Sequence, residues 1–403
     1  MRIKKSVKII LVLLLILLIV GISIYLYREK FMYREIDINP NNFDVEVFSE
    51  VKLSSLVVNV DLNEDMIIDT ENIGTQELII KYKKDKKRYK SKITINVEDN
   101  TAPTVFTSTV TTTQGTKVDL LDKFLAGDNY DDTPKKEIIG EYDFNKIGTY
   151  NLTYRITDSS NNETERNFKL IVKEKQKQTS SSSVNTNYYS DRDRTNFTDV
   201  IDKHKTDHTM IGIDVSKWQG EIDFNKVRDA GCEFVIIRLG YQKGLHGELV
   251  IDPYFGENIK NAKEAGLLVG VYVYTYSSSI EESKEQASWA LKNLGSYELD
   301  LGITYDWESW NYFNKLNLSY HNFTKVADAF LDYVEKYNNK GYLYSSKYYL
   351  ENIWTEEKHD IWLAHYTKET SYQGKYKIWQ LCSNGKITGI NGDVDIDIMY
   401  LNN

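Results

Sequence analysis

The distribution of apolar and polar residues changes along the chain. The first distinct segment is an almost wholly apolar run over residues 9–27. Basic residues lie before it, within residues 1–8, and Arg28 and Lys30 follow it. A helix of nineteen residues, rising about 1.5 Å per residue, spans about the 30 Å of a bilayer core. The run therefore predicts a transmembrane helix over 9–27, with the basic tip 1–8 in the cytoplasm because positive residues favour that side.

A cleaved signal peptide is the alternative interpretation of this run. Its apolar core would be shorter, about 7–15 residues, and would end in small residues. Here bulky residues occupy positions 24–27, so we favour a retained anchor. This predicts a single-pass protein of the cell membrane, with its N-terminus cytoplasmic and the chain after residue 30 extracellular.

Two segments after this run resemble each other. Each carries the triplet Ile-Gly-Thr, at Ile73 and at Ile147, followed by two stretches in which polar and apolar residues alternate. Short alternating strands between turn residues are typical of β-sandwiches. We therefore expect two all-β sandwiches, residues 31–100 and 101–173, which resemble the immunoglobulin-like modules of bacterial surface proteins. A passive spacer is the simplest role for such modules, and a wall- or protein-binding role is the alternative.

Residues 174–207 have a different composition. They include a serine run at 180–183 and polar residues with scattered tyrosines. A segment of this kind buries no core, so it predicts a flexible linker.

From 208 to 403 apolar runs of strand length alternate with amphipathic stretches of helix length. Residues 211–215, 234–239 and 267–274 are examples of the apolar runs. Continuous apolar strands separated by helices predict a parallel sheet covered by helices, and closure into a TIM-like (β/α) barrel is the best interpretation. After residue 361 strand-like pieces occur without helices between them, so we expect the barrel to be irregular there.

Charge and cysteine content exclude several classes of function. The net charge of −9 argues against a nucleic-acid-binding protein, which would show a basic face. Cys232 and Cys382, the two cysteines, lie in apolar surroundings and resemble small core residues, although a disulfide between them stays open. The six histidines are scattered and show no metal-ligand spacing, so they do not predict a zinc site.

Candidate catalytic residues follow from the predicted barrel, in which functional groups project from the C-terminal ends of strands. Asp214 ends the first strand, Asp306 and Glu308 end the fourth, and Asp395 lies in a late acidic stretch. Residues two apart on a strand share a face, so Asp306 and Glu308 should point together into the barrel mouth. Because two close carboxyls do not both ionise readily, one keeps its proton, and such a pair can cleave a glycosidic bond.

Aromatic residues near the strand ends add to this chemistry, because sugar rings stack on aromatic faces. We expect some of them to bind substrate and others to fill the core. Arg238, at the end of the second strand, either contacts substrate or pairs with a barrel carboxylate, and we favour the pairing. The aromatic candidates are Tyr272, Tyr274, Trp307, Tyr366 and Trp379.

Residues 208–403 resemble the family 25 glycoside hydrolases, which are lysozymes of the muramidase type. The resemblance rests on motifs in family order: Asp-Val-Ser-Lys-Trp-Gln-Gly at 214–220, Phe-Val-Ile-Ile-Arg-Leu-Gly-Tyr at 234–241, Gly-Val-Tyr-Val-Tyr at 270–274, Tyr-Asp-Trp-Glu at 305–308, Ile-Trp-Leu-Ala-His-Tyr at 361–366, Ile-Trp-Gln at 378–380 and Gly-Ile-Asn-Gly-Asp-Val-Asp at 389–395. Val273 and the pair Leu381-Cys382 depart from the family pattern at the cleft wall.

The resemblance implies an irregular (β/α) barrel that hydrolyses the β-1,4 bond between N-acetylmuramic acid and N-acetylglucosamine without a cofactor. It implies that Glu308 is the general acid and that Asp306 positions the acetamido group or stabilises the charged intermediate. Asp214 and Asp395 would line the site and tune its charge.

The sequence thus predicts a membrane-anchored extracellular lysozyme whose partner is the glycan strands of peptidoglycan, for wall remodelling or lysis. A catalytically inactive peptidoglycan-binding scaffold is the alternative, but the four intact carboxylates argue against it. A partner in a cell-envelope assembly is a further possibility that rests on analogy alone.

Overall fold

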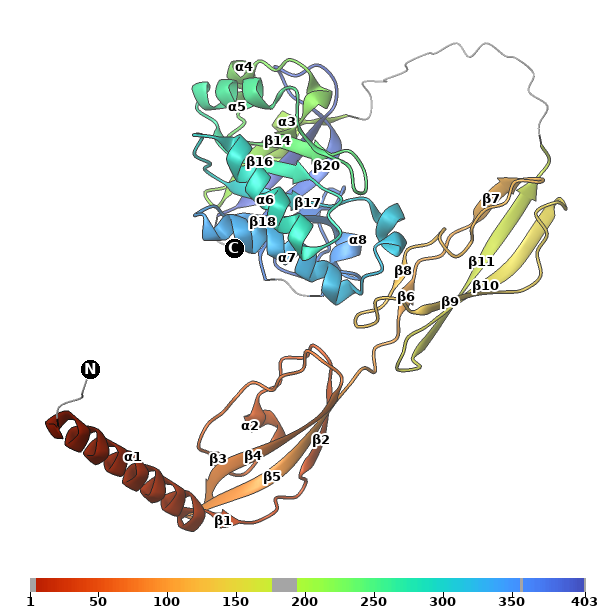
Figure 1. Ribbon diagram of the computed structural model, residues 1–403. Coiled ribbons are helices and arrows are strands. Elements are labelled where there is room, and N and C mark those ends of the chain that lie inside the picture. The colour runs from red at the N-terminus through yellow and green to blue at the C-terminus, as the bar shows by residue number, and fades with distance from the viewer. Residues whose placement is uncertain (1–4, 176–193, 356–357, 402–403) are drawn as a thin grey trace. The chain divides into compact units, whose positions relative to one another are not determined.

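The structure, a computed structural model, describes residues 5–175, 194–355 and 358–401 (Figure 1). The chain divides into two units, Met1–Asn100 and Thr101–Asn403. The linker predicted at 174–207 falls mostly on residues 176–193, which lie outside the described residues.

The first unit holds a long helix and one mixed sheet. The apolar run folds as helix α1, and the sheet has the strand order β1-β5-β4-β3, with β2 paired to β5. The alternating pattern of β5 turns Ile93, Ile95 and Val97 into the core, because successive side chains of a strand point to opposite faces. The elements are α1 (Lys5–Met32), β1 (Arg34–Glu35), β2 (Asn42–Glu46), α2 (Leu53–Leu56), β3 (Asp61–Leu62), β4 (Gly74–Lys84) and β5 (Lys87–Glu98).

The transmembrane helix predicted over 9–27 is the part of the expected fold class that is wrong. Within the described residues, no helix combines the length and the apolar character that crossing a bilayer requires.

The second unit begins with a small β-rich part, residues 101–173, which we call the β module. Its main sheet has the order β7-β11-β10-β9, and β6 pairs with β8 in a separate two-stranded sheet. Leu152, Tyr154 and Ile156 of β10 alternate into its core and pack with Leu170 of β11. The strands are β6 (Thr104–Val105), β7 (Val110–Thr113), β8 (Ala126–Gly127), β9 (Lys135–Ile139), β10 (Gly148–Thr157) and β11 (Glu163–Lys173).

An eight-stranded barrel forms the rest of the second unit. Its ring runs β13-β14-β16-β17-β18-β19-β20-β21, and β21 closes it by pairing with both β20 and β13. Neighbouring strands from β13 to β20 are parallel, whereas β21 is antiparallel to both of its neighbours. Residues 365–377 and 387–393, which join the last three strands, hold no helix, so the barrel is irregular where the sequence predicts it.

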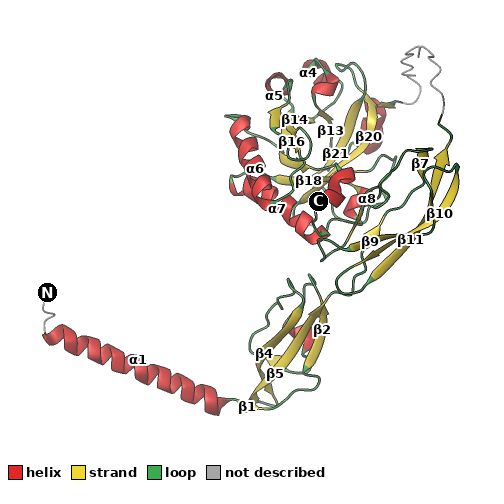
Figure 2. Cartoon of the chain, turned by 45° about the vertical axis from the view of Figure 1, so that its right-hand side comes forward, coloured by secondary structure: helices red, strands yellow, loops and turns green. Residues whose placement is uncertain are grey.

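Helices α5, α6 and α7 lie on the outside of the barrel strands (Figure 2). The barrel elements are β12 (Thr195–Asn196), α3 (Phe197–His204), β13 (Thr209–Val215), η2 (Lys217–Gln219), α4 (Phe224–Asp229), β14 (Phe234–Gln242), β15 (Leu249–Ile251), α5 (Phe255–Glu264), β16 (Leu268–Tyr274), α6 (Ile280–Leu294), β17 (Gly302–Asp306), η3 (Trp310–Lys315), α7 (Tyr320–Lys336), β18 (Gly341–Ser346), α8 (Lys347–Leu350), β19 (Asp360–Ala364), β20 (Ile378–Lys386) and β21 (Val394–Tyr400).

Ordered structure precedes the predicted start of the barrel at 208. Strand β12 pairs with β20, and helix α3 buries Phe197 and Val200 in the barrel core. These two residues are three apart and so share one helix face. The sequence pattern places them in the linker because the apolar stripe is only two turns long.

The β module packs against the segment that joins β17 to α7. The side-chain amide of Asn314 donates to the carbonyl oxygen of Phe124 at 2.6 Å, and its oxygen accepts from the Ala126 amide at 3.2 Å. At the start of α7, Asp132 accepts from the Ser319 amide at 2.6 Å and from the Asn322 side chain at 2.8 Å. The module therefore holds the barrel segment that follows Glu308.

Replacing Asp132 by alanine should loosen this contact. We expect amide hydrogen exchange at Ser319 to accelerate about fivefold, the factor that corresponds to one lost hydrogen bond. The matched control is Asp119→Ala, because Asp119 accepts from Leu121 within the module. Equal exchange at Ser319 in wild type and Asp132→Ala would contradict the contact.

Candidate active site

A cavity of about 240 Å3 opens at the C-terminal ends of the barrel strands. Eight of the ten residues that the sequence predicts for the site line it: Asp214, Arg238, Tyr272, Tyr274, Asp306, Glu308, Tyr366 and Asp395. Six further residues complete its wall: Ser216, Trp218, Gln219, Tyr344, Trp362 and Gln380. The strand ends thus bring together residues that lie far apart in the sequence.

Asp306 and Glu308 project into this cavity from the end of β17. Asp306 is 4% exposed, whereas Glu308 is accessible from the cavity. Tyr305 and Trp307 alternate to the opposite face and are completely buried against the helices. The pair therefore consists of a buried carboxyl beneath an open one.

The surroundings of this pair favour the protonated form of both carboxyls. Burial raises the pKa of Asp306 well above its usual value, and the neighbouring charge of Glu308 raises it further, while Arg238 opposes the shift. Partial desolvation by the cavity wall also raises the pKa of Glu308. Two interacting acids of this kind titrate as a unit, so the pair retains a proton to higher pH than either isolated carboxyl would.

A second group of carboxyls lies on neighbouring strands. Asp214 of β13 pairs in register with Asp395 of β21, and Asp397 of the same strand points to the same face. Burial raises the pKa of Asp395 to about 6 and raises the pKa values of Asp214 and Asp397 well above their usual range. The charge of Glu308 contributes to the shift at Asp395, which couples the two acidic groups.

Gln380 connects the acidic group to the aromatic wall. Its amide nitrogen donates to Asp214 at 2.7 Å, and its oxygen accepts from the hydroxyls of Tyr344 at 2.8 Å and Tyr366 at 2.9 Å. The amide thus fixes the orientation of three cavity residues. The hydrogen bond from Gln380 favours the ionised form of Asp214, against the effect of burial on its pKa.

Arg238 pairs with a carboxylate, which is the interpretation that the sequence favours. Its guanidinium lies 2.6 Å from Asp252, whose side chain is 1% exposed. Asp252 also accepts from the amides of Lys217 and Tyr254. Arg238 is therefore held in place and presents its charge to the cavity wall beside Asp306.

Two predicted aromatic residues lie away from the cavity. Trp307 packs edge-on against Trp310 and Phe323 in the core. Trp379 is 2% exposed, and its indole nitrogen donates to the carbonyl oxygen of His365 at 2.9 Å. The structure therefore places both in supporting positions behind the wall.

Trp218 is an exposed aromatic residue that the sequence analysis does not single out. It is 76% exposed at the edge of the cavity, and Lys217 lies over its ring at 4.9 Å. An exposed indole face is suited to stacking on a sugar ring. Trp218 and Gln380 both lie in the motifs quoted above, but nothing in their local sequence separates a wall residue from a core residue.

The two cysteines, whose pairing the sequence leaves open, are both free and buried. Cys232 packs within the barrel core, where its thiol donates to the carbonyl oxygen of Phe234 at 3.2 Å. Burial raises the pKa of both thiols, so both side chains behave as small apolar residues.

Replacing Asp395 by asparagine should flatten the pH dependence of stability. Its pKa is raised from 3.8 to about 6 on folding, so the wild-type carboxyl contributes stability below about pH 4 and loses it as the pH rises through about 6. The free energy of unfolding of wild type relative to Asp395→Asn should therefore fall by on the order of 2–3 kcal/mol between about pH 4 and pH 7. Urea unfolding measures it, with the surface variant Asp229→Asn as control; identical profiles for wild type and Asp395→Asn would refute the shift.

The barrel part of the chain is similar to known proteins. A family model described as "Glycosyl hydrolases family 25" matches residues 213–390. The chain is 31% identical over 196 residues to the uncharacterized protein YegX of Escherichia coli (strain K12), covering 47% of this chain and 70% of YegX. It is 28% identical over 195 residues to the autolytic lysozyme of Clostridium acetobutylicum, covering 47% of this chain and 55% of that protein.

Among solved structures, the chain is similar to the modular autolysin LytC from Streptococcus pneumoniae. The identity is 30%, the match covers 49% of this chain and 48% of that chain, and the TM-score is 0.42. The chain thus spans about half the length of the autolytic lysozyme and of the LytC structure. From the family model and the extent of the YegX match, the chain belongs to glycosyl hydrolase family 25, and its C-terminal part is a glycoside hydrolase of the lysozyme (muramidase) type.

Proposed function

We propose that this protein hydrolyses the β-1,4 bond between N-acetylmuramic acid and N-acetylglucosamine in peptidoglycan, with Glu308 as the general acid. The observation that carries the proposal is the pairing of an accessible carboxyl with a buried one at the base of an open cavity. Such a pair supplies one proton and one negative charge within the same site.

The residues take complementary parts in the reaction. Glu308, which the cavity leaves accessible, gives its proton to the leaving glycosidic oxygen as the bond from that oxygen to the anomeric carbon breaks. Negative charge on the pair then stabilises the positive charge that develops on the sugar ring. Water supplies the new oxygen on the anomeric carbon, and its proton returns to the carboxylate.

The cavity wall supports a sugar substrate. Tyr274 and Tyr366 present aromatic surface, and Trp218 adds an exposed face at the rim. Flat rings offer a large contact area with little loss of conformational entropy, which suits pyranose rings. The acidic group around Asp395 lies on the same wall and adjusts the charge next to Glu308.

We further propose that residues 31–100 and 101–173 are immunoglobulin-like modules and that the enzyme remodels or lyses the wall outside the cytoplasmic membrane. The alternating strands of both segments and the small buried core of residues 101–173 support the first part. The location of peptidoglycan outside the cytoplasmic membrane supports the second. The hydrogen bonds between the β module and Asn314 support a second role for the module, which is to stiffen the catalytic unit.

Replacing Glu308 by glutamine should abolish clearing of purified peptidoglycan in a gel assay. The glutamine side chain keeps the size of the original but supplies no acidic proton, so we expect a rate loss of about 10²–10⁴-fold. The exposed Glu298→Gln is the matched control and should retain full activity. Circular dichroism and the unfolding midpoint verify that Glu308→Gln folds; full activity in a folded Glu308→Gln protein would refute the acid assignment.

Digestion of peptidoglycan should produce new reducing ends on N-acetylmuramic acid. This follows from cleavage of the bond on the C1 side of that sugar. Borohydride reduction of the products followed by mass spectrometry identifies the reduced sugar. Reduced N-acetylglucosamine in its place would mean that the enzyme cuts the other glycosidic bond.

A further inference from the structure

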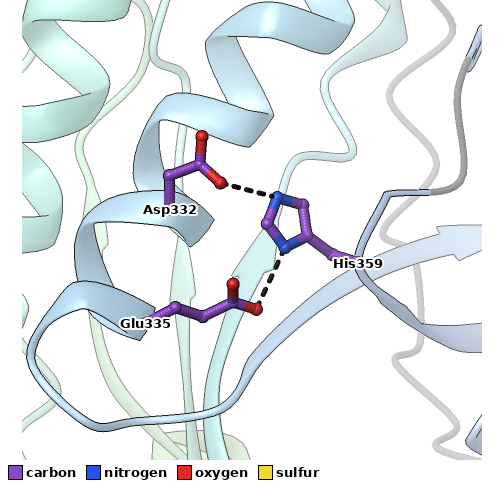
Figure 3. A group of neighbouring side chains, drawn as sticks. All are labelled: Asp332, Glu335 and His359. Carbon is purple, nitrogen blue, oxygen red and sulfur yellow. Dashed lines mark hydrogen bonds and ion pairs between the residues drawn. The ribbon is translucent and has the colours of Figure 1, made fainter.

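A group of ionisable side chains lies at the end of the barrel opposite to the catalytic cavity. His359 directly precedes β19, whereas the cavity is reached from the other end of the strands. Asp332 and Glu335, on the last turns of α7, face the His359 ring from two sides (Figure 3). Asp328, one turn earlier on α7, reaches the same ring.

The imidazole of His359 is oriented as a metal-ligating histidine is. Its Nδ1 lies 3.0 Å from a carboxylate oxygen of Glu335, which fixes the ring. Metal-ligating histidines usually use one nitrogen for the metal and the other for such a carboxylate or carbonyl partner. Nδ1 has that partner, so Nε2 is the nitrogen left for a cation.

The second nitrogen is buried and faces carboxylate oxygens. The His359 side chain is 3% exposed, and Nε2 makes no hydrogen bond with any residue that the structure describes. Asp332 Oδ1 lies 3.4 Å from it and Asp328 Oδ1 lies 3.5 Å from it. Both distances exceed the usual length of an N–H···O hydrogen bond, which is about 2.7–3.2 Å.

The same distances fit a bound cation. Two ligand atoms that each lie about 2.0–2.1 Å from a tetrahedral zinc ion are about 3.4 Å apart. Around an octahedral ion with bonds of similar length, neighbouring ligands would be only about 3.0 Å apart. One nitrogen and two carboxylate oxygens are ordinary ligands for zinc, and water completes four-coordination.

We infer that Nε2 of His359 and the carboxylates of Asp332 and Asp328 bind one zinc-type divalent cation, with Glu335 as the residue that orients the imidazole. The site ties the last turns of α7 to the start of β19. It lies away from Glu308, so its role is to stabilise the barrel. The inference is independent of the proposed glycosidase activity.

Lys358 is the competitor for this cation. Its ammonium lies 2.6 Å and 2.7 Å from the two carboxylate oxygens of Asp332. A rival interpretation is therefore that the carboxylates form ion pairs with His359 and Lys358 and that no metal ion binds. The two interpretations differ in what removal of Lys358 does, because only a cation site gains affinity when a competing positive charge is removed.

Zinc binding to the full chain tests the inference. After treatment with a chelator and its removal, competition with a chromophoric indicator should give one zinc ion per chain, and zinc should raise the unfolding midpoint. Cobalt bound in its place should give the intense visible absorption of tetrahedral coordination. The absence of stoichiometric binding, or a weak octahedral cobalt spectrum, would overturn the inference.

Variants assign the binding to these residues. His359→Gln and Asp332→Asn should each abolish it, Glu335→Gln should weaken it about 10–100-fold, and Lys358→Met should strengthen it. Asp332 is half exposed, so its variant keeps the test valid if His359→Gln fails to fold. The control Glu264→Gln, on the exposed side of α5, should bind as wild type does.

Further measurements on these variants test the ligand set and separate this inference from the proposed activity. Undiminished zinc binding in Asp332→Asn, or unchanged affinity in Lys358→Met, would contradict the proposed ligand set. Glu308→Gln should bind zinc as wild type does, which separates failure of this inference from failure of the proposed hydrolase activity.

Discussion

The chemistry that we propose depends on the burial of two neighbouring carboxyls at the end of one barrel strand, where the charge of Glu308 adds to the shift in the pKa of Asp306. Asp306 ends β17 within the closed ring and is buried, and Glu308, two residues on, opens to the cavity. In water both would ionise near their ordinary pKa values, because solvent would screen the charges. Beside a low-dielectric wall the pair keeps a proton, and that proton is what an acid catalyst needs near neutral pH. Arg238, anchored by Asp252, limits how far the pKa of Asp306 rises.

The arrangement holds because each neighbouring element fixes one side of the pair. Closure by β21 brings Asp395 next to Asp214, and Gln380 on β20 ties Asp214 to two tyrosines of the wall. On the other side, the segment after Glu308 is attached to the β module through Asn314. A part of the chain that resembles a spacer in sequence thus also restrains the segment that follows Glu308.

Periodicity and strand-end position predicted the barrel and most of the cavity wall, because both depend on local spacing. The Asp306–Glu308 pair followed from the alternation of side chains on a strand. Three features needed the tertiary structure. Trp307 and Trp379 carry the right side chain but face the core, and α3 is too short to give a clear apolar stripe. The group around His359 joins α7 to a histidine that lies 24 residues after Glu335 and directly precedes β19. The described part of α1 is helical, yet none of the helices within the described residues is long and apolar enough to cross a membrane.

The most direct test of the account is a carbon-13 NMR titration of the Asp306 and Glu308 carboxyl carbons in wild type and in Glu308→Gln. The account predicts that Asp306 titrates well above pH 4 in wild type and that its pKa falls when the charge at position 308 is removed. Two carboxyls that titrate independently near pH 4, with Asp306 unchanged in the variant, would contradict it.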